Sequence, residues 1–216
     1  MIRILDATPS LLSHFLAEIR DEEIQKDSMR FRRNLERTGE IFAYEISKEL
    51  NYRSKNVQTS LGIAEANIMN SKILLGTILR AGLPMHQGML NYFDKAENAF
   101  VSAYRKYDNN GDFNIKIEYT SSPSPEGKIL ILTDPMLATG LSMTLACNEL
   151  FKAGKPLHTH LVVLIASREG LSYLQKKLDM NNITIWAAAV DDELTAKSYI
   201  VPGLGDAGDL AFGTKE

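Results

Sequence analysis

The sequence predicts an α/β fold with a mainly parallel central sheet flanked by helices. From residue 72 onward, short apolar runs alternate with segments of helical periodicity, the order that builds parallel sheets through right-handed crossovers. The apolar runs are continuous rather than alternating, as in strands that are buried on both faces. A length of 216 residues fits one larger α/β unit, so we expect residues 1–216 to form a single domain.

Charge and composition exclude several classes of protein. The net charge is −3, with 44% apolar and 24% charged residues, so no global charge draws the chain to nucleic acid or anionic membranes. One cysteine, Cys147, excludes an internal disulfide. The first residues lack the apolar segment that a secretion signal or a membrane span needs. We expect a cytoplasmic protein that binds neither nucleic acid nor membrane.

Residues 1–50 are predicted to form a helical arm. Apolar residues at helical spacing follow Ser10, a good N-cap, and a second apolar stripe runs from Phe31 to Leu50. The second helix carries Arg30, Arg32, Arg33 and Arg37. Such a cluster is usually a solvated face, although it could also line an anion site or bind RNA. Residues 51–70 indicate a short strand or hairpin.

The next segment predicts a strand over 73–79, a turn at Arg80-Ala81-Gly82 and a helix that carries His86 on its surface. An arginine at the carboxyl end of a parallel strand points into the crevice where such sheets bind ligands. Its guanidinium can hold a diphosphate through paired hydrogen bonds; the alternative is a surface arginine at the sheet edge. Residues 99–121 predict a hairpin with a turn at 108–112, placed as a flap over a substrate.

The segment 128–154 organises the rest of the chain. An apolar strand ends at Asp134, a loop of small residues follows, and a helix is expected with Ser142 as N-cap and Gly154 as C-cap. This order can hold a phosphate, because the first helix amides have no partners and the helix dipole favours an anion. Asp134 could accept hydrogen bonds from sugar hydroxyls. The alternative is an ordinary turn between strand and helix.

Two more buried strands, 160–166 and 183–190, are expected around a helix at about 169–178. The acidic run after the last strand, 191–193, could bind metal, but adjacent carboxylates at a strand end are usually solvated. The tail contains Gly-x-Gly-x-x-Gly at 203, 205 and 208, yet no second strand follows, so a dinucleotide fingerprint is excluded. Its glycines indicate backbone shaped to approach a small flat ligand, or a tail that simply ends the fold.

Three motifs resemble the type I phosphoribosyltransferase family. Asp134 to Gly140, DPMLATG, is similar to the family's loop for phosphoribosyl diphosphate (PRPP), and Pro135 in place of a second acidic residue indicates the uracil branch. Residues 78–83 resemble its diphosphate loop, and the tail YIVPGLGDAGD from Tyr199 resembles its uracil-binding signature. The resemblance covers nearly the whole chain, with the motifs in the family's order.

The resemblance implies a set of site residues. PRPP would be bound by Arg80, Arg105, Asp134, Pro135, Met136, Leu137, Ala138, Thr139, Gly140, Leu141, Ser142 and Asp206. Uracil would be bound by Ile200, Gly205, Asp206 and Ala207, within a tail of about 191–216. Arg80, Asp134 and Asp206 would be catalytic. No side chain would bind metal directly, because Mg²⁺ would be held mainly through PRPP and water.

The implied activity converts uracil and PRPP to UMP and diphosphate in pyrimidine salvage, with Mg²⁺ as cofactor. Main-chain amides can match the two carbonyls of uracil, whereas the amino group of cytosine would meet them donor against donor. A homodimer or higher homo-oligomer is expected. GTP is an effector that the family resemblance allows and the sequence does not decide.

Three positions depart from the family pattern. Lys106 follows Arg105 where an acidic residue is usual, Leu141 replaces a glycine, and Leu210 replaces an arginine. With the arginine cluster at 30–37, these departures support a rival: a non-catalytic nucleotide- or RNA-binding regulator on the same fold. A second rival is a transferase for a purine or an unusual pyrimidine, because base recognition through the backbone is hard to read from sequence.

Overall fold

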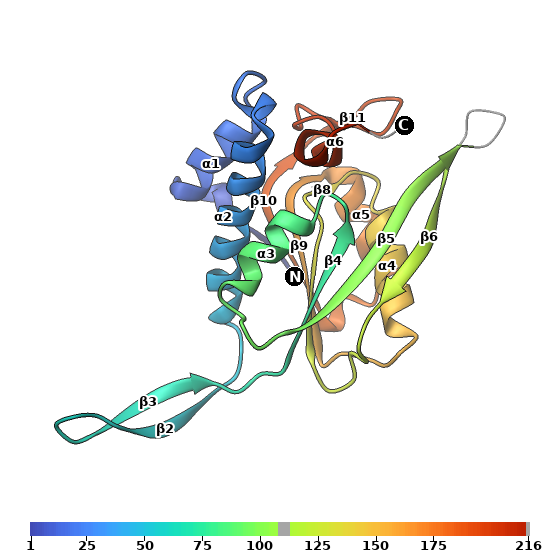
Figure 1. Cartoon of the computed structure of the whole chain (residues 1–216). Helices are drawn as coiled ribbons and strands as arrows, with labels where there is room; N and C mark the ends of the chain where they lie inside the picture. The colour runs from blue at the N-terminus through green and yellow to red at the C-terminus, as the bar shows by residue number, and fades with distance from the viewer. Residues whose placement is uncertain (108–112, 215–216) are drawn as a thin grey trace.

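The computed structural model describes residues 1–107 and 113–214. Its centre is a mostly parallel sheet with the strand order β1-β10-β9-β7-β4-β5-β6, in which β8 also pairs with β9. Every pairing in this sheet is parallel except that of β5 with β6. The predicted α/β class with a mainly parallel sheet is therefore confirmed (Figure 1).

The strands of the central sheet are β1 (Ile2–Ile4), β4 (Ile73–Leu79), β5 (Glu97–Tyr107), β6 (Phe113–Ser121), β7 (Ile129–Thr133), β8 (Met136–Leu137), β9 (His158–Ser167) and β10 (Ile183–Asp191). The helices are α1 (Leu11–Arg20), α2 (Ser28–Ser47), α3 (Leu83–Leu90), α4 (Leu141–Phe151), α5 (Arg168–Lys177) and α6 (Ala207–Phe212). Two small sheets pair β2 (Tyr52–Gln58) with β3 (Ile63–Met69), and β11 (Glu193–Leu194) with β12 (Ile200–Val201).

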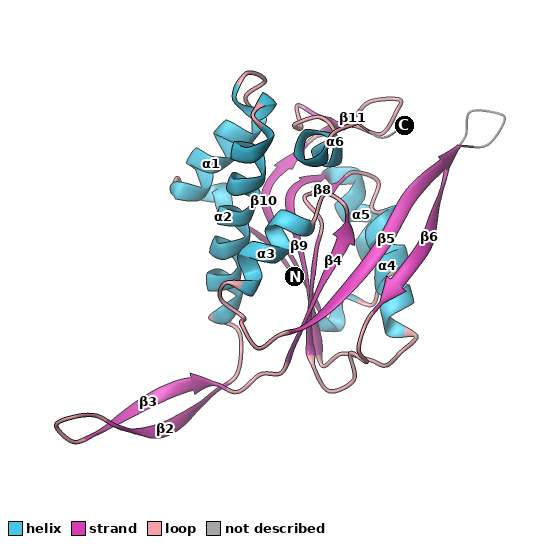
Figure 2. Ribbon diagram, viewed as in Figure 1, coloured by secondary structure: helices cyan, strands magenta, loops and turns pink. Residues whose placement is uncertain are grey.

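Helices cover both faces of the sheet (Figure 2). On one face, α1, α2 and α3 bury a core that includes Phe31, Phe42 and Trp186. On the other face, α4 and α5 bury a second core around Met143 and Leu174. The continuous apolar runs read from the sequence are strands covered on both sides, because β4, β7 and β9 contribute buried residues to both cores.

The N-terminal arm has the helices that the sequence predicts. Ser10 caps α1 by accepting a hydrogen bond from the backbone of Leu12 and completes a capping box with Ser13. The sequence did not reveal β1, which adds an edge strand before this arm. The hairpin expected within 51–70 is present as β2 and β3 and stands away from the rest of the molecule (Figure 1).

His86 is buried, so the expected surface position was wrong. Only 3% of the residue is exposed, and its Nε2 lies 2.8 Å from Asn98 Oδ1. The reason is that α3 is packed on two sides: a Cβ on Gly88 would lie 1.9 Å from the Glu36 carbonyl oxygen of α2. A helix held this closely between α2 and the sheet has no solvated face at His86, and burial lowers the pKa of that imidazole.

Two expected helix caps were also wrong. Gly140, not Ser142, is the N-cap of α4, and Ser142 lies in the first turn. The left-handed φ of 82° at Gly140 turns the chain into the helix earlier than a serine cap would. At the other end, α4 stops at Phe151 with Lys152 as C-cap, and Gly154 follows in the connection to β9.

Candidate active site

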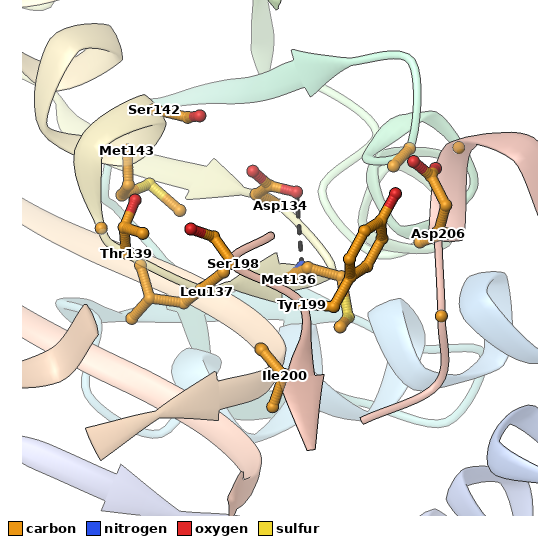
Figure 3. Close-up of a pocket in the computed structure, with 16 residues that line it drawn as sticks. Asp134, Met136, Leu137, Thr139, Ser142, Met143, Ser198, Tyr199, Ile200 and Asp206 are labelled. Carbon is orange, nitrogen blue, oxygen red and sulfur yellow. Dashed lines mark hydrogen bonds between the residues drawn. The ribbon is translucent and has the colours of Figure 1, made fainter. Parts of the chain in front are cut away.

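The site lies at the carboxyl edge of the sheet, where β4, β7 and β10 end. A cavity of about 160 Å³ separates the loop before α4 from the C-terminal tail. It is lined by Ala81, Asp134, Met136, Leu137, Ala138, Thr139, Gly140, Ser142, Met143, Ser198, Tyr199, Ile200, Gly205, Asp206, Ala207 and Gly208. Figure 3 shows Asp134 between the loop residues and Asp206 of the tail.

The loop before α4 is held by contacts with α5. The Ser167 hydroxyl donates to the Ala138 carbonyl at 2.5 Å, and a Cβ on Gly170 would lie only 2.4 Å from that same oxygen. At the helix start, the Thr144 hydroxyl donates to the Gly140 carbonyl at 2.9 Å. These contacts hold the start of α4 at the edge of the cavity. The first amides of the helix can donate hydrogen bonds to a phosphate there.

Asp134 is the carboxylate at the floor of the cavity. It is partly buried and accepts one backbone hydrogen bond, from Met136 at 3.4 Å (Figure 3). Burial is the main cause that raises the pKa of Asp134 to about 7; the hydrogen bond from Met136 opposes this rise, and the negative charge of Asp206 adds to it. An empty site therefore holds this carboxyl close to half-protonated at neutral pH.

The tail is fixed by an ion pair that involves Asp191. Both Asp191 oxygens accept from Arg20 at 2.8 Å, and one of them accepts from the Gly203 amide at 2.8 Å. Arg20 also donates to the Gly203 carbonyl at 2.9 Å. Burial opposes ionisation of Asp191, but the hydrogen bonds from Arg20 and Gly203 outweigh it, so the pKa of this carboxyl is lowered.

The sequence was wrong to treat the 191–193 run as merely solvated, because Asp191 is only 7% exposed and anchors the tail. Asp192, by contrast, is 69% exposed and pairs with Arg168 on the surface. Within the described residues, no group of three or more metal-ligating side chains is assembled. The metal reading of this run therefore has no support in the structure.

The glycines of the tail serve its conformation. Gly203 and Gly205 have φ values of 55° and 92°, in the left-handed region that favours glycine. They bring the chain past the cavity to Asp206, which is the N-cap of α6 and accepts from the Asp209 amide at 3.0 Å. At the other end of α6, Arg32 of α2 donates to the Ala211 carbonyl at 2.6 Å.

The four clustered arginines of α2 all have partners within the chain. Arg30 pairs with Glu18 at 2.5 Å and Arg33 with Glu36 at 2.7 Å. Arg37 donates to the Asn34 side chain at 3.1 Å, and Arg32 holds α6 as described. Leu210, which replaces the family's arginine, is partly buried and packs against the core on this side of the sheet.

Arg80 lies beside the cavity rather than in its wall. Its Nη2 donates to Asp209 Oδ1 at 3.0 Å and to the Gly213 carbonyl at 3.1 Å. The neighbouring Ala81 lines the cavity instead. Pro135 and Leu141 are likewise absent from the wall, while the backbone of Arg105 is part of β5 and its side chain lies outside the described residues.

Most of the predicted residues come together in one place. The cavity wall contains Asp134, Met136 to Gly140 and Ser142 from the loop, and Ile200 and 205–207 from the tail. The sequence reading missed Ala81, Met143, Ser198, Tyr199 and Gly208. Tyr199 and Gly208 belong to the quoted tail motif and could have been added, whereas Met143 reads as an ordinary core residue.

Comparison with known proteins shows the family to which the chain belongs. A family model described as uracil phosphoribosyltransferase matches residues 7–214. A protein of Porphyromonas gingivalis named uracil phosphoribosyltransferase is 54% identical over 211 residues, covering 98% of this chain and 97% of the relative. A protein of the same name from Methanothermobacter thermautotrophicus is 37% identical over 216 residues, with 99% and 95% covered.

A solved structure of a protein from Aquifex aeolicus matches with a TM-score of 0.87 and 32% identity, covering 99% of each chain. The overall fold, including its added hairpin and helical arm, is thus similar to an experimental structure over almost its whole length. By the family model and by these identities, the chain belongs to the uracil phosphoribosyltransferase family.

Proposed function

We propose that this chain transfers the phosphoribosyl group of PRPP to N1 of uracil, giving UMP and diphosphate. The observation that carries the proposal is one cavity that joins the helix-start loop, the Asp134 and Asp206 carboxylates and the glycine-shaped tail. The close relatives that share almost the full length of the chain carry the name of this activity. The enzyme is a pentosyltransferase.

The 5′-phosphate of PRPP is assigned to the loop 138–142. The amides at the start of α4 point out of the helix without internal partners, and the helix dipole adds to their attraction for an anion. The positive φ of Gly140 turns the chain into α4 at the cavity wall, and the missing side chain lets this backbone pack closely against Gly170 of α5. Asp134 lines the same cavity, and we assign its carboxylate to accept hydrogen bonds from the ribose hydroxyls.

The base is assigned to the tail. Ile200, 4% exposed, supplies an apolar surface, and the backbone at Gly205 and Ala207 supplies amides and carbonyls. A uracil ring presents two acceptors and a donor along one edge, which main-chain groups can match. The amino group of cytosine would face an amide donor, and a buried mismatch of this kind gives strong discrimination.

The diphosphate is assigned to Arg80 and Arg105. A guanidinium is always charged and can take two phosphate oxygens at once. The transferred carbon develops oxocarbenium character as its bond to diphosphate breaks and the bond to uracil N1 forms. We therefore assign catalysis to alignment of the reactants and to charge stabilisation of the departing diphosphate. We assign the carboxylates of Asp134 and Asp206, which line the same cavity, to stabilise the positive charge that develops on the ribose.

Mg²⁺ fits the residues at this site. Asp134 and Asp206 are oxygen donors on one cavity, and their mutual repulsion contributes to the raised pKa of Asp134. A hard cation with its coordinated waters is the species that such carboxylates bind well. Bound with PRPP, the ion would neutralise diphosphate charge; within the chain, the two carboxylates would orient its water ligands.

Other assignments stay predictions. The β5–β6 hairpin runs past the ends of the neighbouring strands (Figure 1), in keeping with a flap over the substrate, although its turn at 108–112 lies outside the described residues. Apolar residues on the β2–β3 hairpin, Leu61 at 98% and Ile63 at 72% exposure, support the expected homo-oligomer. GTP as an effector has no supporting feature on the described surface. In the part of the chain that is described, no helix is long and apolar enough to cross a membrane.

The enzyme reading is favoured over a non-catalytic regulator. The regulator needed four arginines available for RNA, and the described structure pairs each of them with a group of the same chain. The regulator hypothesis also drew on the departure from the family pattern at Leu210, whereas Leu210 packs against the core. Both features thus have a role within the fold that does not depend on a nucleic acid.

The direct test is UMP formation from uracil, PRPP and Mg²⁺, with cytosine and hypoxanthine in parallel. We expect turnover with uracil alone and a loss of about 100-fold in Asp206→Asn, which keeps the shape of the carboxylate without its charge. Asp192→Asn is the matched control, because it removes a charge from the exposed pair with Arg168. Turnover with hypoxanthine, or none with any base while PRPP still binds, would reject the proposal.

A further inference from the structure

Asp209 is a carboxylate of the tail to which the proposed reaction assigns no role. It lies on α6 and accepts from Arg80 Nη2 at 3.0 Å, while the Gly213 carbonyl accepts from the same nitrogen at 3.1 Å. The two side chains of this ion pair are about one-third exposed, at 35% for Arg80 and 32% for Asp209. Both partners of Arg80 therefore come from the C-terminal segment and hold one amino group.

Within the described part of the chain, the rest of the Arg80 guanidinium makes no such hydrogen bond. A guanidinium carries five N–H donors, of which Nη2 has two, and those two are matched by Asp209 and Gly213. Arg80 Nε is buried and has no acceptor within the described part of the chain. A buried donor without a partner is costly, so an acceptor that reached this nitrogen would remove that cost. The ion pair orients the arginine without saturating it.

Asp209 is also connected to the cavity. Its amide donates to Asp206 Oδ1 at 3.0 Å. Between them lies Gly208, where a Cβ would sit 3.2 Å from Asp206 Oδ1 and 3.8 Å from Arg80 Nη2. Arg80 and Asp206 thus approach each other over Gly208, which lines the cavity. The first residues of α6 join the diphosphate loop to the tail that shapes the base subsite.

We propose that Asp209 is a positioning residue, which holds the Arg80 guanidinium with its unused donors directed to the diphosphate of PRPP. This inference rests on the proposed function. Asp209 itself does not touch the substrate; it acts through Arg80. Because Asp209 belongs to the same short helix as Ala207, the arrangement also fixes the diphosphate and base subsites relative to each other.

The test is PRPP binding with Mg²⁺ by calorimetry, together with steady-state kinetics, for Asp209→Asn and Asp209→Ala. We expect the Kd and KM for PRPP to rise about tenfold in Asp209→Ala, with kcat changed by less than about threefold, because only the orientation of one phosphate ligand is lost. Asp209→Asn keeps an acceptor for Nη2 and should lie between. Asp192→Asn removes an exposed ion pair and should leave both constants unchanged.

A double-mutant cycle then assigns the effect to Arg80. If Asp209 acts through Arg80, adding Asp209→Ala to Arg80→Ala changes PRPP affinity by less than about twofold. Additive effects, or tighter PRPP binding by Asp209→Ala, would overturn the proposal, the second because it would make Asp209 a competitor. Circular dichroism and melting temperature show that each variant is folded.

The outcomes separate this inference from the proposed function. A wild-type protein that binds PRPP but makes no UMP rejects the function, and the calorimetric cycle still decides whether Asp209 positions Arg80. A wild-type protein that makes UMP but shows additive variants rejects the inference alone. A wild-type protein that does not bind PRPP rejects both.

Discussion

Two pairs of polar groups at opposite ends of the central sheet differ in how fully they are hydrogen-bonded. At the amino end of β9 and β10, the Trp186 indole donates to His160 Nδ1 at 3.0 Å, and His158 Nε2 lies 2.9 Å from the Thr184 hydroxyl. At the carboxyl edge, Asp134 has one long backbone hydrogen bond and Arg80 Nε has no described acceptor. Partnered groups stabilise the fold, whereas under-partnered groups around a cavity await a ligand.

The pKa values of His160 and Asp134 are also shifted in opposite directions. Burial, with smaller contributions from His158 and Arg3, lowers the pKa of His160 to about 3. Burial and Asp206 raise the pKa of Asp134 to about 7. Both pKa shifts favour the neutral form of the group. Only at the carboxyl end can an incoming cation or hydroxyl group stabilise the charged form instead.

The largest effect is expected at the carboxyl end, from Asp134→Asn. UMP formation should fall by about 100-fold, because the amide cannot supply the negative charge that faces the ribose. The melting temperature of the empty protein at neutral pH should not fall, since the buried carboxylate is a burden in that state. Normal turnover by Asp134→Asn would contradict the functional difference between the two ends, because it would make Asp134 a structural group like His160.

A loss of stability without a loss of affinity is expected at the amino end, from His160→Ala. Removal of the ring leaves a cavity and an unpaired Trp186 N–H, which should cost about 2–4 kcal/mol of unfolding free energy in urea titrations. KM for PRPP and uracil should stay within about twofold. His14→Ala is the matched control, because the His14 side chain is 65% exposed; a changed KM in His160→Ala alone would contradict the structural role.

The same two variants should change the pH dependence of stability in opposite directions. The folded His160 cannot take up the proton that the unfolded chain binds below its ordinary pKa of 6.5, so it removes stability as pH falls from 6.5 toward 3. Asp134 keeps its proton in the folded state, so it removes stability as pH rises from 3.8 toward 7. Melting temperatures between pH 4 and 7 should fall less on acidification in His160→Ala, and more in Asp134→Asn, than in the wild type.

A smaller effect is expected from Gly140→Ala, which tests the rigidity of the phosphate loop. A Cβ at this φ of 82° would lie 2.9 Å from the Gly170 carbonyl oxygen, so we expect a cost of about 1–3 kcal/mol and weaker PRPP binding. Gly127→Ala is the control, because Gly127 also has a positive φ, 70°, but a Cβ there meets nothing within 4 Å. Equal effects of the two variants on PRPP binding would show that the contact with α5 is unimportant.

The smallest effect is expected from Arg32→Ala, which releases the Ala211 carbonyl at the end of α6. One hydrogen bond is worth about 1 kcal/mol, and we expect a two- to fivefold rise in KM for uracil, by kinetics, as α6 loosens. Arg33→Ala, which breaks only the i,i+3 pair with Glu36, should leave KM unchanged. A rise in both variants would point to a general effect of helix α2.

The sequence predicted the parts of this molecule that depend on local patterns. Apolar runs located β4, β7, β9 and β10, and the motif around Gly140 located a loop that lines the cavity. It did not predict the burial of His86, because that depends on the approach of α3 to α2 at Gly88, a contact between segments distant in sequence.

Hydrogen bonds between residues far apart in the sequence explain why the partners of Arg80 and Asp191 could not be predicted. The partners of Arg80 are 129 and 133 residues away, and those of Asp191 include Arg20, 171 residues away. A motif can identify such a residue as polar and well placed, but not the partner that fixes its orientation. The contacts of Asp191 with Arg20 and of Asp209 with Arg80 therefore became visible only in the folded structure.

The carboxyl edge holds the Asp134 carboxyl in an environment that disfavours its charge until a ligand binds. Calorimetry of Mg²⁺–PRPP binding at pH 7, repeated in buffers of different ionisation enthalpy, counts the protons released on binding. Because the pKa of Asp134 is about 7 in the empty site, ionisation on binding should release about half a proton per site more in the wild type than in Asp134→Asn. Equal proton release by the two proteins would contradict the account.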